Sequence, residues 1–132
     1  MDYAGPADVF AAIEGAEAAV AQRLRALSES LASARAFATS VLRDHERHRA
    51  TRARLRARLG LPPAPPVRAR GEDLLSLAAL RSDQESLVHA HAEGLPAIDD
   101  PPSVDALARN MVDLARHLAV VDLWIEAEES RG

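Results

Sequence analysis

The sequence predicts an all-α protein that folds as an antiparallel four-helix bundle. Four stretches carry apolar residues at the alternating three- and four-residue spacing of an amphipathic helix. Short proline- or serine-rich segments separate these stretches. No alternating β-branched run of useful length occurs, so a sheet is not expected. A bundle is the most economical way for four helices to bury four apolar stripes.

The first two expected helices form a hairpin. The first covers about residues 7–32, because Pro6 and Asp8 are typical of a helix start and an apolar stripe follows them. A serine-rich turn leads into the second helix, which covers about residues 35–60. It is expected to end at Gly60, which acts as a C-terminal cap.

The connector over residues 61–71 contains four prolines, so it is expected to be extended rather than helical. A third helix follows over about residues 72–97, where two acidic residues suit its N-terminal end. The fourth covers about residues 103–129, with Ser103 as its N-cap. An extended connector of this length reaches almost as far as a helix, so both an up-down-up-down path and a crossover remain open. Residues 1–132 are expected to form one domain, because the chain is long enough for one core only.

Composition excludes several kinds of site. The chain has no cysteine, so any metal must be bound by histidine and carboxylate groups. A net charge of -4 and an aromatic content of 3% argue against a nucleic-acid partner. Neither a secretory signal nor a bilayer-spanning stretch is found, so we expect a cytoplasmic protein that does not enter a membrane. Abundant alanine, with arginine in place of lysine, indicates a GC-rich bacterial genome.

Polar residues interrupt the apolar stripes, and counting from the turns puts them near mid-height. Glu17 lies in line with the first stripe, where an unpaired carboxylate would be expensive to bury. One interpretation is a hydrogen-bonded network that fixes helix register, with His45, His48 or Arg81 as the partner. The other is a His/carboxylate metal site. Further polar residues on or beside the core faces are Asp44, Gln84, Glu85, His91, His117 and Asp122.

The stretch LRDHERHRATRARLRARLG at residues 42–60 is similar to the second helix of small bacterial ferritin-like domains. That family builds its metal site from glutamates and Glu-x-x-His motifs that face the centre of a four-helix bundle. The resemblance implies that Glu17, His48 and Glu85 are metal ligands on the first three helices.

The chain departs from the family pattern at two places. His45 stands where the family has a glutamate, and the last helix lacks the Glu-x-x-His motif. Its nearest remnant is Asp113 with Arg116 or His117, and Asp113 is expected to face solvent. These departures predict a vestigial or atypical site that binds metal weakly at best, holding either none or a single iron, zinc or manganese ion. Its residues are Glu17, His45, His48 and Glu85.

No catalytic residue is identified, so the sequence leaves open whether the protein is an enzyme. The two histidines of HERH at residues 45–48 are three apart, whereas the zinc-protease motif places them four apart. Glycine-rich phosphate loops and serine nucleophile elbows are also missing. The alternative function is a non-catalytic helical interaction or dimerisation module whose buried polar layer is purely structural.

Two surfaces stand out in the sequence. Seven arginines between Arg43 and Arg58 are interpreted as a solvated helix face that complements the helix dipole. The last helix is apolar nearly all round from residue 117 to 127, with Val120 and Trp124 opposite its core stripe. This pattern predicts a homodimer interface at Val120 and Trp124. The alternative is that Trp124 covers a helix end or the connector.

Overall fold

The chain folds into four α-helices, and no β-strand occurs in residues 3–68 and 73–131, which the computed structural model describes. The prediction of an all-helical protein with four helices is therefore confirmed. The helices are α1 (Pro6–Ser30), α2 (Arg35–Arg58), α3 (Leu77–Gly94) and α4 (Pro101–Arg131), with short 3-10 turns η1 (Ala32–Ala34) and η2 (Leu95–Ala97).

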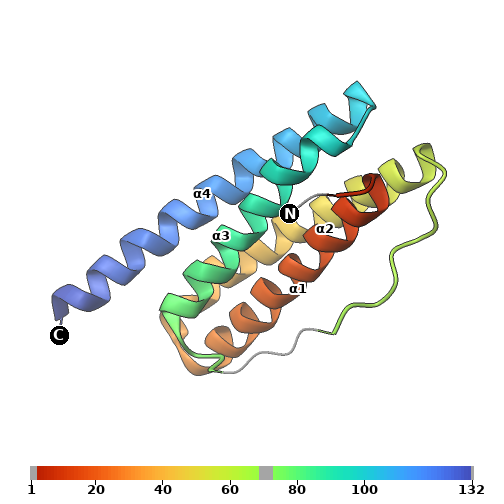
Figure 1. Cartoon of the computed structure of the whole chain (residues 1–132). Coiled ribbons are helices and arrows are strands. Elements are labelled where there is room, and N and C mark those ends of the chain that lie inside the picture. Colours follow the sequence, from red (N-terminus) through yellow and green to blue (C-terminus); the bar gives the residue numbers. More distant parts are fainter. Residues whose placement is uncertain (1–2, 69–72, 132) are drawn as a thin grey trace.

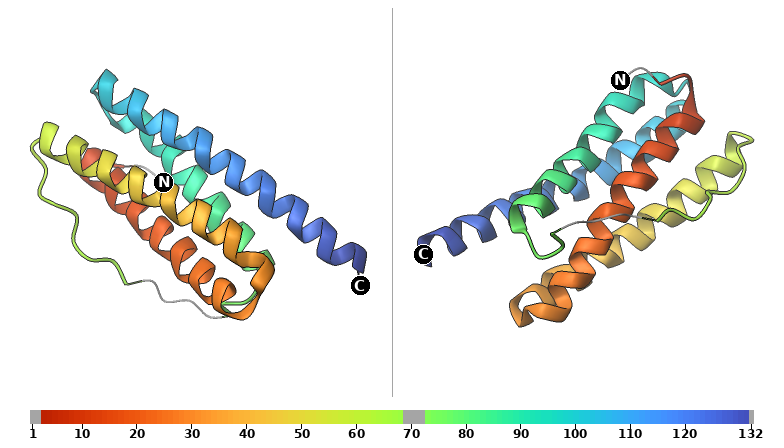
Figure 2. Two further views of the ribbon diagram at one scale, coloured as in Figure 1. Left: turned by 180° about the vertical axis from the view of Figure 1, so that it is seen from behind. Right: turned by 60° about the horizontal axis from the view of Figure 1, so that its bottom comes forward.

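The helices form a ring in which α1 packs against α2 and α3, and α4 packs against α3 and α2 (Figure 1). The α2 helix ends at one end of the bundle, and residues 61–68 run back along the outside of α1 and α2 (Figure 2). The α3 helix therefore begins at the end where α1 turns into α2. Of the two paths that the sequence left open, the chain takes the crossover.

Glycine allows two features of this arrangement. Gly60, at φ 70, occupies the left-handed region that follows a helix end. The Leu61 amide donates to the Arg56 carbonyl at 2.8 Å, which completes the cap of α2. At Gly94, an added Cβ would lie 2.4 Å from Cγ1 of Val9, so the missing side chain lets α1 and α3 approach closely.

The α3 helix begins later than the sequence predicted. Its first residue is Leu77, and the Ser76 hydroxyl caps it by accepting a hydrogen bond from the Ala79 amide at 3.1 Å. Asp73 lies before the helix with φ 56, a left-handed conformation that interrupts helical geometry. The predicted start at residue 72 lies outside the described residues.

The α4 helix begins earlier than predicted, at Pro101. Prolines suit the first turn of a helix because they lack the amide hydrogen that would have no partner there. The Asp100 carbonyl accepts from the amides of Ser103 and Val104 at 3.0 and 3.1 Å. Ser103 therefore lies inside the first turn rather than at the N-cap, and its hydroxyl donates to the Asp100 carboxylate.

The core is built from one stripe on each helix with alternating three- and four-residue spacing. Most positions of each stripe are apolar and buried, but every stripe also contains polar members near its middle. The stripe of α1 is Phe10, Ile13, Glu17, Val20, Leu24 and Leu27, and that of α2 is Ala38, Val41, His45, His48, Arg52 and Leu55.

Within the described residues, no helix is both long and apolar enough to cross a bilayer.

Candidate functional site

A group of polar side chains, which we call the polar core, lies buried inside the bundle. Each member is at most 7% exposed, and all four helices contribute. Buried polar groups normally have hydrogen-bond partners, so the pairing of these residues shows what the interior is built to do. The members are Glu17 of α1, His45, His48 and Arg52 of α2, Gln84 and His91 of α3, and Asn110 and His117 of α4.

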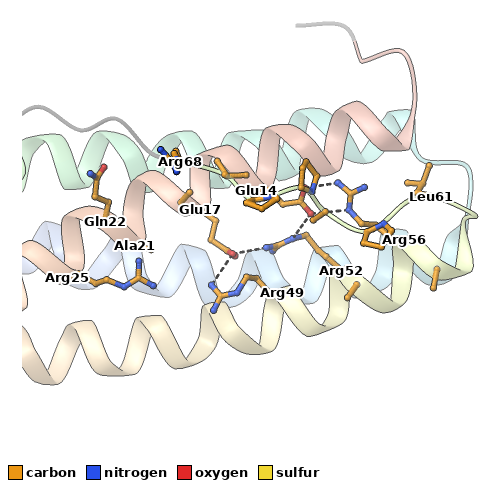
Figure 3. A pocket seen from close by; sticks show the side chains of 18 residues that line it. Glu14, Glu17, Ala21, Gln22, Arg25, Arg49, Arg52, Arg56, Leu61 and Arg68 are labelled. Atoms are coloured by element: carbon orange, nitrogen blue, oxygen red, sulfur yellow. Dashed lines mark hydrogen bonds and ion pairs between the residues drawn. The ribbon is translucent and has the colours of Figure 1, made fainter.

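Two buried ion pairs join α1 to α2 (Figure 3). Nη2 of Arg52 donates to Oε1 of Glu17 at 2.7 Å, and Nη1 of Arg49 lies 3.5 Å from the same oxygen. About one turn away, Arg56 holds Glu14 through two parallel hydrogen bonds of 2.7 and 3.1 Å. A bidentate arginine–carboxylate pair has a specific geometry, so it fixes the axial register of α1 against α2.

Two His–Asp pairs join α2 to α4. Nε2 of His48 is 2.8 Å from Oδ2 of Asp113, and Nε2 of His117 is 2.7 Å from Oδ2 of Asp44. The pairs are reciprocal, because each helix supplies one aspartate and, four residues later, one histidine. Arg47 also contacts both carboxylates, at 2.5 Å from Asp44 and 3.4 Å from Asp113. Positive charge on Arg47 therefore faces both aspartates.

The electrostatics of the His–Asp pairs follow from burial and hydrogen bonding. Burial acts to raise the pKa of Asp44, but hydrogen bonds from His117 and Arg47 outweigh it and leave the pKa lowered. Burial also acts to raise the pKa of Asp113, but its hydrogen bond with His48 outweighs burial and the pKa is lowered. Burial lowers the pKa of His117 despite its bond with Asp44. At neutral pH the aspartates are charged and His117 is neutral.

His45 and His91 lack charged partners. His45 is fully buried, and neither ring nitrogen has a hydrogen-bond partner among the described residues. Burial lowers its pKa to about 3. His91 is 1% exposed and its Nδ1 lies 2.9 Å from the Leu87 carbonyl, which requires that nitrogen to donate. Burial lowers its pKa to about 4. Both rings are therefore neutral at physiological pH.

The four residues predicted as metal ligands have different surroundings. The ring of His45 lies 6.2 Å from that of His48. The carboxylate of Glu17 is instead paired with Arg52. Glu85 has a 42%-exposed side chain bound to Arg81 at 2.6 Å, while its neighbour Gln84 occupies the core position. No group of three or more histidines and carboxylates in the described part of the chain has metal-site geometry.

Sequence reasoning missed several participants in these contacts, among them Glu14, the buried partner of Arg56. Arg52 and Arg56 were assigned to a solvated face, but they are 2% and 5% exposed. Asp113 was expected to face solvent, but it is only 16% exposed at its side chain and is bound to His48. The signal for Arg52 was its position in the stripe of α2, four residues after His48. The signal for Asp113 was the repeated Asp-x-x-x-His spacing on α2 and α4.

The predicted interface residues lie near the C-terminal end of α4. Val120 is 42% exposed. Trp124 is half-buried, and its ring makes an edge contact with the Phe37 ring of α2 at 6.0 Å. Trp124 therefore lies against the start of α2 rather than opposite the core.

No family model, curated protein or solved structure matches the chain.

Proposed function

We propose that the chain is a ferritin-like, antiparallel helical bundle with a vestigial metal centre, and that it acts as a non-catalytic interaction module. Contacts between helices support the antiparallel arrangement. Glu14 and Glu17 of α1 contact Arg56 and Arg52 of α2, so residue numbers rise on one helix as they fall on the other. The crossover connection after α2 is the path used by bundles of the ferritin type.

The Glu17–Arg52 pair is the observation that carries the proposal. In a ferritin-like metal site, the first-helix glutamate and its neighbours supply negative charge to a cation. Here a guanidinium that is 2% exposed lies against that carboxylate at 2.7 Å. A cation placed beside Arg52 would be repelled, and it would also have to displace an existing ion pair. The donor set of Glu17, His45, His48 and Glu85 therefore does not fit a tightly held metal.

Metal analysis tests this part of the proposal. Protein purified without chelators is expected to contain no stoichiometric iron, zinc or manganese, and the thermal midpoint should not rise when these ions are added. The control is the double variant Glu17→Gln with His48→Gln, which removes the two central donors but keeps side-chain volume. A stoichiometric metal in the natural chain that the double variant loses would overturn the vestigial assignment.

Three exposed apolar side chains on α4 support the interaction role. Val112 and Leu123 are 67% and 66% exposed, and Val120 lies between them on the same helix. Exposed apolar groups gathered along one helix are typical of a surface that another protein covers. The occupant that we propose is a second copy of the chain.

The solution mass tests the homodimer. We expect the mass of a dimer by sedimentation equilibrium, and the mass of a monomer for the double variant Val120→Glu with Leu123→Glu, because two carboxylates cannot be buried there without partners. The matched control is Ala50→Glu, at an exposed position of α2. A monomeric natural chain, or equal dissociation by the control, would rule out this interface.

A further inference from the structure

A pocket of about 870 Å³ opens between α1, α2 and the connector. Residues 14–25 of α1 and 49–57 of α2 form its floor, and residues 61–68 form the opposite wall (Figure 3). Its volume is within the range of pockets that enclose small organic ligands. The pocket lies outside the polar core but shares Glu17 and Arg52 with it.

The space exists because of two sequence features. The connector contains four prolines, which hold it extended and prevent it from packing as a helix on α1 and α2. It is tied down at its start, where Nη1 of Arg56 donates to the Pro62 carbonyl at 3.0 Å. The floor beneath it is lined with short side chains, namely Ala18, Ala21, Ala53 and Ala57.

The pocket is positively charged although the chain as a whole is negative. Five arginines and two glutamates line it. Both glutamates are already held in ion pairs by Arg52 and Arg56. The remaining charge lies on Arg49, Arg25 and Arg68, and no ion pair joins Arg25 or Arg68 to another described residue. An excess of guanidinium groups therefore faces a space with apolar walls.

Arg52 provides a second observation that points to a ligand. Its side chain is 2% exposed, and Nη2 is satisfied by Glu17. Nε and Nη1 have no hydrogen-bond partner in the described part of the chain, although they are buried. Nε lies 3.8 Å from the Glu14 carboxylate, which is beyond hydrogen-bonding distance. Arg52 therefore lines the pocket and has donors that no described group uses.

We propose that this pocket binds an amphipathic organic anion, with a carboxylate or phosphate head and an apolar body. The unused donors of Arg52 would bind the head, because the planar fork of arginine matches the geometry of both oxyanions. Arg25, Arg49 and Arg68 line the same space and would supply further positive charge. The alanines of the floor and the prolines and Val67 of the connector would contact the apolar body. A small hydrophilic anion would leave this apolar surface uncovered, and an uncharged lipid would leave the arginines unpaired.

Isothermal titration with a matched set of small probes tests the ligand class. Octanoate and octyl phosphate carry both features, octanol lacks the charge, and acetate lacks the apolar chain. At least one of the first two is expected to bind about tenfold tighter than octanol and acetate, since only these two probes use both the charged groups and the apolar walls. The tighter of the two identifies the head group. If octanol bound as tightly as the two anions, the proposal would be overturned.

Variants locate the site. The double variant Arg25→Ala with Arg68→Ala removes two unpaired charges and is expected to weaken binding by about tenfold or more. Arg43→Ala with Arg54→Ala removes two exposed arginines of α2 that do not line the pocket, and should leave affinity unchanged. Equal losses in the two double variants would mean that the net charge of the protein, rather than this pocket, attracts the anion.

A steric pair of variants completes the test without changing charge. Ala53→Trp fills the floor of the pocket and is expected to abolish binding. Ala50→Trp places the same side chain at an exposed position of α2 outside the pocket and should bind as the natural chain does. Circular dichroism confirms that each variant is folded before titration. Unchanged binding by folded Ala53→Trp would exclude the pocket.

Discussion

Replacing Arg52 with alanine is expected to lower the free energy of unfolding by about 3–5 kcal/mol, the loss typical when one partner of a buried ion pair is removed. In the natural chain the Arg52 guanidinium lies 2.7 Å from the Glu17 carboxylate, and the variant leaves this 3%-exposed carboxylate without it. Arg49 remains at 3.5 Å, but its side chain is 48% exposed and contributes less. Urea denaturation at pH 7 measures the difference.

Two further variants separate a lost partner from general damage. Arg54→Ala removes an exposed arginine of the same helix and should change stability by less than about 0.5 kcal/mol. The double variant Glu17→Leu with Arg52→Met replaces the whole pair by apolar groups and is expected to be as stable as the natural chain or more so. Equal effects of Arg52→Ala and Arg54→Ala would show that the buried pair does not contribute to stability.

Acidification is expected to destabilise the fold well before the carboxylates titrate. Burial lowers the pKa of His45 to about 3 and that of His91 to about 4, whereas both would titrate near 6.5 in the unfolded chain. Between these values the unfolded state binds more protons than the folded state, so stability is present above pH 6.5 and is lost as pH falls. Each histidine should lower the free energy of unfolding by about 2 kcal/mol between pH 7.5 and 5. His117, whose pKa burial also lowers, adds to the same trend.

Denaturation midpoints at pH 7.5 and 5 check this prediction. The variant His45→Leu should lose less stability on acidification than the natural chain, since it removes one of the contributing protons. His89→Leu, at an exposed position of α3, should show the natural pH dependence. A stability that is flat between pH 7.5 and 5, or equal slopes in the two variants, would contradict the neutral, buried state of His45.

The periodicity of apolar residues was sufficient to predict the four helices, but not to identify every residue that they bury. On α2, the spacing that identified Val41, His45 and His48 leads directly to Arg52. Arg52 was assigned to a solvated face whose arginines complement the helix dipole. Its partner is on another helix, and the pattern of one helix carries no information about the side chains that face it.

The path of the chain was also beyond the sequence. Residues 61–68, the described part of the predicted connector, are non-helical as expected, but a connector of this length suits either connection. The choice depends on which helix pairs match, and that match includes the Asp44–His117 and His48–Asp113 contacts. The late start of α3 follows from the φ of 56 at Asp73 and from the N-cap at Ser76. Serine is a preferred N-cap residue, a local signal that the prediction of a start at residue 72 did not use.

The polar core has a consequence for the temperature dependence of folding. Positions that hold leucine or valine in an ordinary bundle hold arginine, histidine, glutamine and asparagine here. Unfolding therefore exposes less apolar and more polar surface, and these two contributions to the heat capacity of unfolding have opposite signs. The curve of stability against temperature is flatter as a result. The desolvation cost of the Glu17–Arg52 and Glu14–Arg56 ion pairs also falls on heating. The net contribution of these pairs to the free energy of unfolding therefore rises with temperature.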